Sequence, residues 1–191
     1  MCRWLAYLGP PTELSAVVIR PDHSLIDQSL RARQSQHTTN GDGFGVAWYT
    51  RNDGPRRYRS THPAWNDPNL RDLADQVHSP LFMAHVRAAT GTAVQYTNCH
   101  PFRHEEWLFQ HNGLIPDFQR VKRSLLLEIA PELFPHIAGS TDSELLFHLA
   151  VTYGLRDDPP TALARMIGLV EDVREQAGID DSLFATLAVS D

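Results

Sequence analysis

The segment MCRW places a cysteine at position 2, one of only two cysteines in 191 residues. A thiolate that attacks an amide needs a base for its proton and donors for the oxyanion. If Met1 is removed, the free amine of Cys2 has an ordinary pKa of about 7.7–8.0, which suits a base at neutral pH. One residue would then supply both the nucleophile and the base. Taken alone, position 2 favours the alternative, a small buried hydrophobic side chain.

Three further positions could complete such a site. His-Asn-Gly at 111–113 ends an expected strand, where the amide of Asn112 and the N–H of Gly113 could form an oxyanion hole. Arg87 follows another expected strand and could hold a carboxylate by two parallel bonds. Asp142 lies in the first turn of an expected helix and could hold a ligand ammonium. Each has a structural alternative: an Asn-Gly turn, a surface arginine, and an acidic residue that stabilises a helix amino terminus.

Two other patterns do not support a function. NGDGFG at 40–45 has glycines like those of a dinucleotide-binding loop, but a strand pattern follows it where that loop needs a helix. Histidines and a cysteine also gather in one region: His85, Cys99, His100, His104 and His111. This set lacks the short, regular spacings of zinc ligands. We therefore predict no metal and no cofactor.

The elements that must position the candidate residues do not alternate regularly between strand and helix. Strands are expected at 4–8, ending at Gly9-Pro10-Pro11, and at 44–50, 56–60, 81–87, 106–113 and 183–191. RNDGP at 51–55 predicts the turn of a hairpin. Helices are expected from Asp67-Pro68, over 117–129, from a Thr141 cap to Tyr153, and from Pro159. This order predicts an α+β fold with mainly antiparallel sheets.

Length and charge limit the remaining choices. A chain of 191 residues suits one domain, over 1–191, and its net charge of −6 argues against a nucleic-acid partner. Few cysteines, no signal peptide and no long apolar run predict a soluble protein of the cytoplasm without membrane contact. The last strand stops where a turn should begin, so we expect the fold to be truncated at the C-terminus.

The order of five motifs resembles the class II glutamine amidotransferases. The motifs are MCRWLAYLG, NGDGFGVAWY, HVRAATGTAVQYTNCHPF, WLFQHNG and GSTDSE. That family consists of N-terminal-nucleophile hydrolases, so the resemblance implies a four-layer α/β/β/α sandwich. The chain is most similar to a small stand-alone branch, which is related to the glutathione-degrading amidotransferase-like subunit of yeasts and to the ergothioneine-pathway γ-glutamyl hydrolase.

The resemblance also implies roles for individual residues. Cys2 would be the nucleophile, with its freed amine as the base. Asn112 and the N–H of Gly113 would form the oxyanion hole. Arg87 would bind the α-carboxylate of the substrate, and Asp142 its α-ammonium.

Thr90 would add a hydrogen bond to the same carboxylate, while Gly91 stands where some family members have a histidine. The implied activity is hydrolysis of the γ-glutamyl amide bond of glutamine or of a γ-glutamyl compound, through a cysteine thioester. The alternative is a non-catalytic or ammonia-donating subunit of a larger amidotransferase complex. The partners would be this small-molecule substrate and, in the alternative, a further subunit.

Overall fold

The computed structural model describes residues 2–31, 39–50, 54–89 and 91–191. The strands are β1 (Arg3–Glu13), β2 (Phe44–Thr50), β3 (Gly54–Ser60), β4 (His78–Val86), β5 (Phe102–His104), β6 (Trp107–Leu114) and β7 (Phe184–Ser190). The helices are α1 (Leu14–Val18), α2 (Leu25–Leu30), α3 (Pro68–Gln76), α4 (Phe118–Leu127), α5 (Asp142–Thr152) and α6 (Pro159–Gln176). The predicted α+β class with antiparallel sheets is confirmed.

Contacts divide the chain into two compact units. The first runs up to Asn112 and includes Leu187–Asp191, and the second is Gly113–Thr186. The single domain expected over 1–191 stays a prediction.

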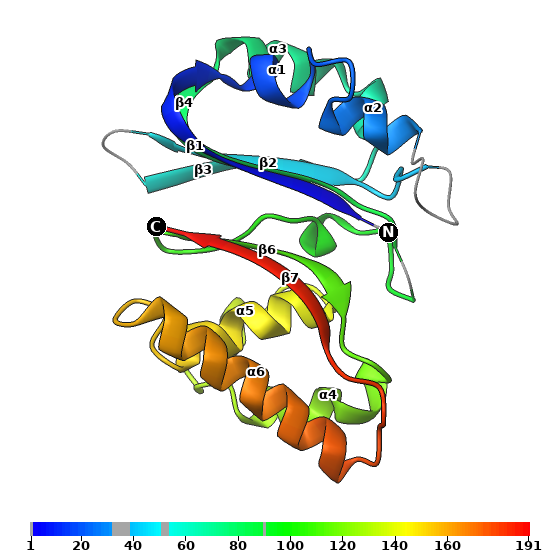
Figure 1. The fold of residues 1–191 in the computed structure, drawn as a ribbon, viewed down its shortest axis with the longest axis vertical. Helices are drawn as coiled ribbons and strands as arrows, with labels where there is room; N and C mark the ends of the chain where they lie inside the picture. The colour runs from blue at the N-terminus through cyan, green and yellow to red at the C-terminus, as the bar shows by residue number, and fades with distance from the viewer. Residues whose placement is uncertain (1, 32–38, 51–53, 90) are drawn as a thin grey trace. The chain divides into compact units, whose positions relative to one another are not determined.

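A four-stranded sheet in the order β1-β4-β2-β3 organises the first unit, and helices α1, α2 and α3 cover one of its faces (Figure 1). Successive side chains of a strand point to opposite faces. Val46 of β2 and Phe82 of β4 accordingly pack in the core beneath the helices. Their neighbours Ala47 and Met83 pack on the opposite face, against Leu108 of β6. The two central strands are therefore buried on both faces, which explains their continuous apolar sequences.

Strand β1 is longer than the sequence predicts. It runs through Pro10 and Pro11 to Glu13, although the pattern places its end at these prolines. β1 lies at the edge of the sheet, and its pairing with β4 is interrupted between Leu8 and Thr12. Prolines cannot donate to a ladder, but an irregular stretch of an edge strand tolerates them.

The helix starts follow their capping residues. The carboxylate of Asp67 accepts the N–H of Leu70 at 2.8 Å ahead of α3, and the hydroxyl of Thr141 accepts the N–H of Glu144 at 3.2 Å at the start of α5. Both caps confirm the sequence prediction. The short helices α1 and α2 were not predicted, since five or six residues hold too little periodic pattern to be recognised.

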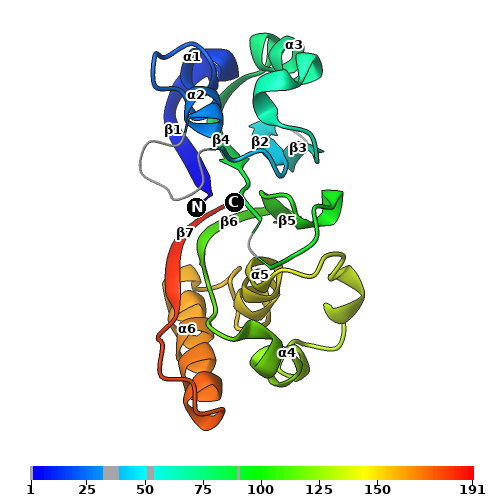
Figure 2. The same cartoon turned by 90° about the vertical axis from the view of Figure 1, so that its right-hand side faces the viewer.

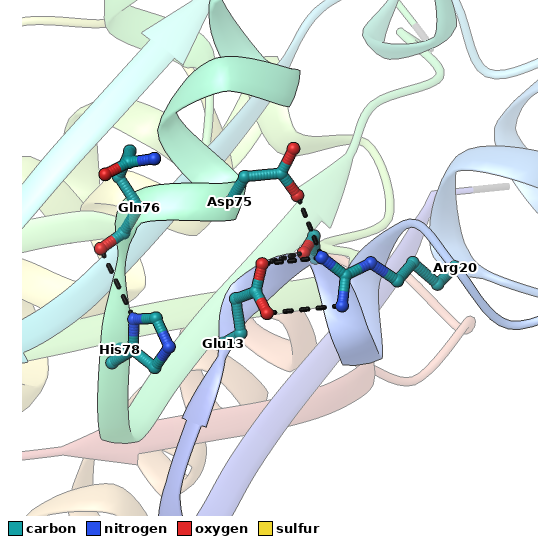
Figure 3. A network of polar contacts seen from close by, with 6 residues as sticks. Glu13, Arg20, Asp75, Gln76 and His78 are labelled. Atoms are coloured by element: carbon teal, nitrogen blue, oxygen red, sulfur yellow. Dashed lines mark hydrogen bonds and ion pairs between the residues drawn. The ribbon is translucent and has the colours of Figure 1, made fainter.

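Polar contacts join the ends of β1, α3 and β4 on the outside of the first unit (Figure 3). Arg20 donates to Glu13 at 2.6 Å and to Asp75 at 3.2 Å, and the ring of His78 lies 3.4 Å from the carbonyl of Gln76. Arg20 and Asp75 are exposed and Glu13 is partly exposed, so water and salt screen their charges. The contacts lie at the end of the sheet remote from residue 2, where β1 ends and β4 begins.

Helices α4, α5 and α6 pack together in the second unit (Figure 2). α5 is its most buried helix, and every residue from Ser143 to Ala150 is buried. The α6 residue Glu171 accepts the N–H of Leu183 at 2.7 Å and so holds the chain before β7. Within the described part of the chain, no helix combines the length and apolar character needed to cross a membrane.

Candidate active site

The register of the four-stranded sheet brings three segments together at one end. Arg3 of β1 and Phe44 of β2 both pair with Val86, the last residue of β4, from opposite sides. Cys2, Gly43 and Arg87 each lie one residue beyond these pairs. Residues that are 41 and 44 positions apart in sequence thus become neighbours through backbone pairing.

The thiol of Cys2 lies against the backbone of Ala88. Its Sγ is 3.3 Å from the nitrogen of Ala88 and 3.4 Å from the carbonyl oxygen of the same residue. Burial raises the pKa of the Cys2 thiol, while the N–H of Ala88 and the positive charge of Arg87 act in the opposite direction. An N–H donor and a nearby cation are the groups that would stabilise a thiolate at this position. Met1 lies outside the described residues.

Arg87 is a buried cation whose partners are neutral. Only 3% of the residue is exposed, and its guanidinium donates to the hydroxyl of Thr92 at 2.6 Å and to the carbonyl of Asp42 at 3.4 Å. A guanidinium has five donors, and no carboxylate among the described residues is paired with this one. Because a buried charge is costly without a counter-charge, Arg87 is suited to receive an anion.

Asp42 ties the loop before β2 to the segment that carries Arg87. Its backbone N–H donates to the carbonyl of Arg87 at 3.1 Å, and its carboxylate accepts the N–H of Ala89 at 2.8 Å. The N–H of Arg87 in turn donates to Gly43 at 2.8 Å. Sequence reasoning missed both Asp42 and Thr92. For Asp42, the glycine-rich NGDGFG was a usable signal, because such a loop permits close backbone approach.

Asn112 is brought to the same place from β6. Its side-chain amide donates to the carbonyl of Cys2 at 2.9 Å, and Gln110, two residues earlier on the same face, donates to Leu5 at 3.0 Å. The amide of Asn112 has a second N–H for an oxyanion. Gly113 follows in β6 and begins the second unit, so its role as a donor stays a prediction.

Asp142 opens α5 in the second unit. Its carboxylate accepts the N–H of Ile115 at 3.0 Å and that of Ser143 at 2.8 Å, so the side chain is held in one orientation by the backbone around it. Binding of a ligand ammonium by Asp142 stays a prediction. Thr90, the remaining predicted site residue, lies outside the described residues.

Two of the clustered histidines form a buried stack. The rings of His85 and His100 lie 4.2 Å apart and nearly parallel, and Phe102 packs edge-on against His100. Burial lowers the pKa of His85 from 6.5 to about 3 and also lowers that of His100. Both rings are therefore neutral at pH 7. Among the described residues, no three histidine, cysteine or acidic side chains are grouped to hold a metal ion.

The fold is that of an N-terminal-nucleophile hydrolase, as its structural relatives show. The chain belongs to the class II glutamine amidotransferases, the family that its residues 16–175 match. The matched range begins after Cys2, so the role of that cysteine remains a proposal.

The chain is 45% identical over 158 residues to the probable glutamine amidotransferase DUG3 of Saccharomyces cerevisiae, covering 78% of this chain and 44% of that protein. It is 36% identical over 117 residues to the gamma-glutamyl-hercynylcysteine sulfoxide hydrolase of Mycolicibacterium smegmatis, covering 60% of this chain and 52% of that protein. A solved glutamine aminotransferase class-II domain protein from Silicibacter pomeroyi superposes with a TM-score of 0.77 at 36% identity, covering 100% of this chain and 73% of that one. The chain thus spans about half the length of the curated relatives that it matches.

Proposed function

We propose that this chain hydrolyses γ-glutamyl amide bonds through a thioester on Cys2. The observation that carries the proposal is the buried cation of Arg87, which lacks an acidic partner among the described residues and directly precedes the residue that contacts the Cys2 thiol. An anion-binding group beside a nucleophile suits a substrate with a carboxylate at one end and an amide at the other. The names of the relatives support this class of substrate, since one is a glutamine amidotransferase and another a γ-glutamyl hydrolase.

In the proposed complex, the α-carboxylate of the γ-glutamyl group pairs with Arg87, and Thr90 adds a hydrogen bond. Asp142 binds the α-ammonium, an assignment that rests on the family resemblance. A cation for the carboxylate and an anion for the ammonium select an amino-acid end group by its two charges. Binding at this remote end holds the γ-carbonyl near the thiol and so lowers the entropic cost of attack.

Catalysis begins with proton transfer from the thiol to the α-amine of Cys2. The sulfur then attacks the γ-carbonyl carbon, a C–S bond forms, and the oxyanion accepts hydrogen bonds from Asn112 and the N–H of Gly113. The intermediate collapses with cleavage of the C–N bond, and the leaving nitrogen takes the proton from the ammonium. Water then attacks the thioester, the C–S bond breaks, and glutamate and the free thiol result.

This mechanism requires removal of Met1. While Met1 is attached, the nitrogen of Cys2 belongs to an amide, which cannot act as a base at neutral pH. The substrate is glutamine or a larger γ-glutamyl amide, and the site of action is the cytoplasm. If ammonia were passed to a further subunit, the thioester would form in the same way.

The test is glutamate release from glutamine, glutathione and other γ-glutamyl amides, with the intact mass recorded before and after a glutamine-mimicking electrophile. Cys2→Ala is expected to lower the rate by at least about 10³-fold, because the nucleophile is lost. Cys99→Ala serves as the matched control and is expected to keep the activity. The proposal fails if Cys2→Ala hydrolyses substrate at the wild-type rate, or if fully active protein retains Met1.

A further inference from the structure

Among the described residues, the hydroxyl of Thr92 is the closest hydrogen-bond partner of the Arg87 guanidinium. It accepts a hydrogen bond at 2.6 Å, whereas the other described acceptor, the carbonyl of Asp42, lies at 3.4 Å. We propose that Thr92 is a positioning residue, which orients Arg87 so that the guanidinium presents its remaining donors to the α-carboxylate of the substrate. This inference rests on the proposed function.

The backbone of Arg87 is fixed independently of Thr92. Its N–H donates to Gly43 at 2.8 Å and its carbonyl accepts from Asp42 at 3.1 Å, which continues the pairing between β2 and β4. Four rotatable side-chain bonds separate this fixed backbone from the guanidinium, so its direction depends on contacts at the tip. Within the described residues, Thr92 is the one side chain that accepts a hydrogen bond from the guanidinium.

A hydroxyl suits this role chemically. Being neutral, it directs the guanidinium without cancelling its charge, whereas an acidic residue at position 92 would compete with the substrate carboxylate. Gly91, the residue before Thr92, has a φ of 74°, a backbone conformation that residues with a side chain rarely adopt. Apart from its chain neighbours, no atom lies within 4 Å of the position a Cβ would take at Gly91, so glycine is favoured there by the backbone conformation and not by crowding.

Two substitutions separate the hydroxyl from the shape of the side chain. Thr92→Val removes the acceptor at nearly constant volume, and Thr92→Ser keeps it. Thr92→Val is expected to raise KM for a γ-glutamyl amide about tenfold, the loss expected for one hydrogen bond to a charged group. Its kcat should change by less than about twofold, since a remote binding contact contributes equally to ground and transition states. Thr92→Ser should keep both constants near the wild-type values.

A ligand pair shows whether the effect passes through Arg87. L-Glutamate carries the α-carboxylate, and 4-aminobutyrate is the same molecule without it. In Thr92→Val, competitive inhibition by L-glutamate should weaken about tenfold, while inhibition by 4-aminobutyrate stays unchanged. A merely structural role would affect both ligands alike and would lower the melting temperature. Thr186→Val, an exposed threonine in β7, is the control for loss of a hydroxyl.

The inference is overturned if Thr92→Val leaves KM unchanged, or if it weakens both inhibitors equally. These results would leave the proposed function intact, provided that the wild-type protein releases glutamate and Cys2→Ala does not. If the wild-type protein with Met1 removed hydrolyses none of the γ-glutamyl amides, the proposed function itself fails, and the Thr92 inference fails with it.

Discussion

At the scale of single residues, the environment of Arg87 is the most informative feature. Surface arginines are common and do not indicate a binding site. Arg87, in contrast, is buried, and its partners among the described residues are neutral. The sequence offered both interpretations, a surface arginine or a carboxylate clamp. Burial excludes the first, and the second remains the reason we propose for keeping a costly charge in the fold.

Arg87→Ala is expected to raise KM for γ-glutamyl amides by roughly 10²-fold, because the charge-assisted bonds to the carboxylate are lost. Arg87→Lys keeps the charge but not the paired donors, so its KM should lie between that of the wild type and that of Arg87→Ala. The measurement is steady-state kinetics with melting temperatures for every variant. Arg103→Ala, at an exposed position, is the control. An unchanged KM in folded Arg87→Ala would contradict the assignment.

At the scale of elements, the register of β4 decides where the site forms. β4 pairs with β1 on one side and β2 on the other, so both neighbours begin beside Val86, where β4 ends. Slipping either strand by one residue would send its side chains to the wrong face of the sheet. Gly45 of β2 is part of the same arrangement, because the backbone of His100 passes directly over it. A Cβ at position 45 would overlap the carbonyl oxygen of His100 and lie 2.9 Å from the Arg59 side chain.

Gly45→Ala is therefore expected to destabilise the fold by about 3 kcal/mol or more, since backbone cannot move aside as a flexible side chain would. The measurement is the free energy of unfolding in urea. Gly168→Ala is the matched control: it lies within α6, nothing surrounds its missing Cβ, and the change should stabilise by up to about 1 kcal/mol. Equal free energies of unfolding for Gly45→Ala and the wild type would contradict the close approach of the His100 backbone to Gly45.

At the scale of the whole molecule, the buried histidines make stability depend on pH. The folded-state pKa of His85 is about 3 and its ordinary value is 6.5. Below pH 6.5 the unfolded chain binds a proton that the folded chain does not, so stability is lost as the pH falls. His100 acts in the same direction. For His85 alone, the loss between pH 7.5 and pH 5 amounts to about 2 kcal/mol.

His85→Gln is expected to remove that part of the pH dependence. The measurement is the free energy of unfolding at pH 7.5 and at pH 5, and the quantity compared is the difference between the two. His62→Gln, at an exposed position, should keep the wild-type difference. If His85→Gln shows the wild-type loss on acidification, His85 is not held neutral in the fold.

Sequence alone determined the local features of this protein. Caps such as Thr141 and the strand expected at 44–50 depend on residues near one another in the chain, and the structure confirms both. The order of the five motifs likewise determined the family, because each motif is a short run of adjacent residues that can be recognised without the fold. Tertiary structure decided the extent of β1, the burial of Arg87 and the contacts of Asp42 and Thr92 with it. These depend on strand pairing and on turns that bring distant backbone together, and no local pattern in the sequence encodes such distances.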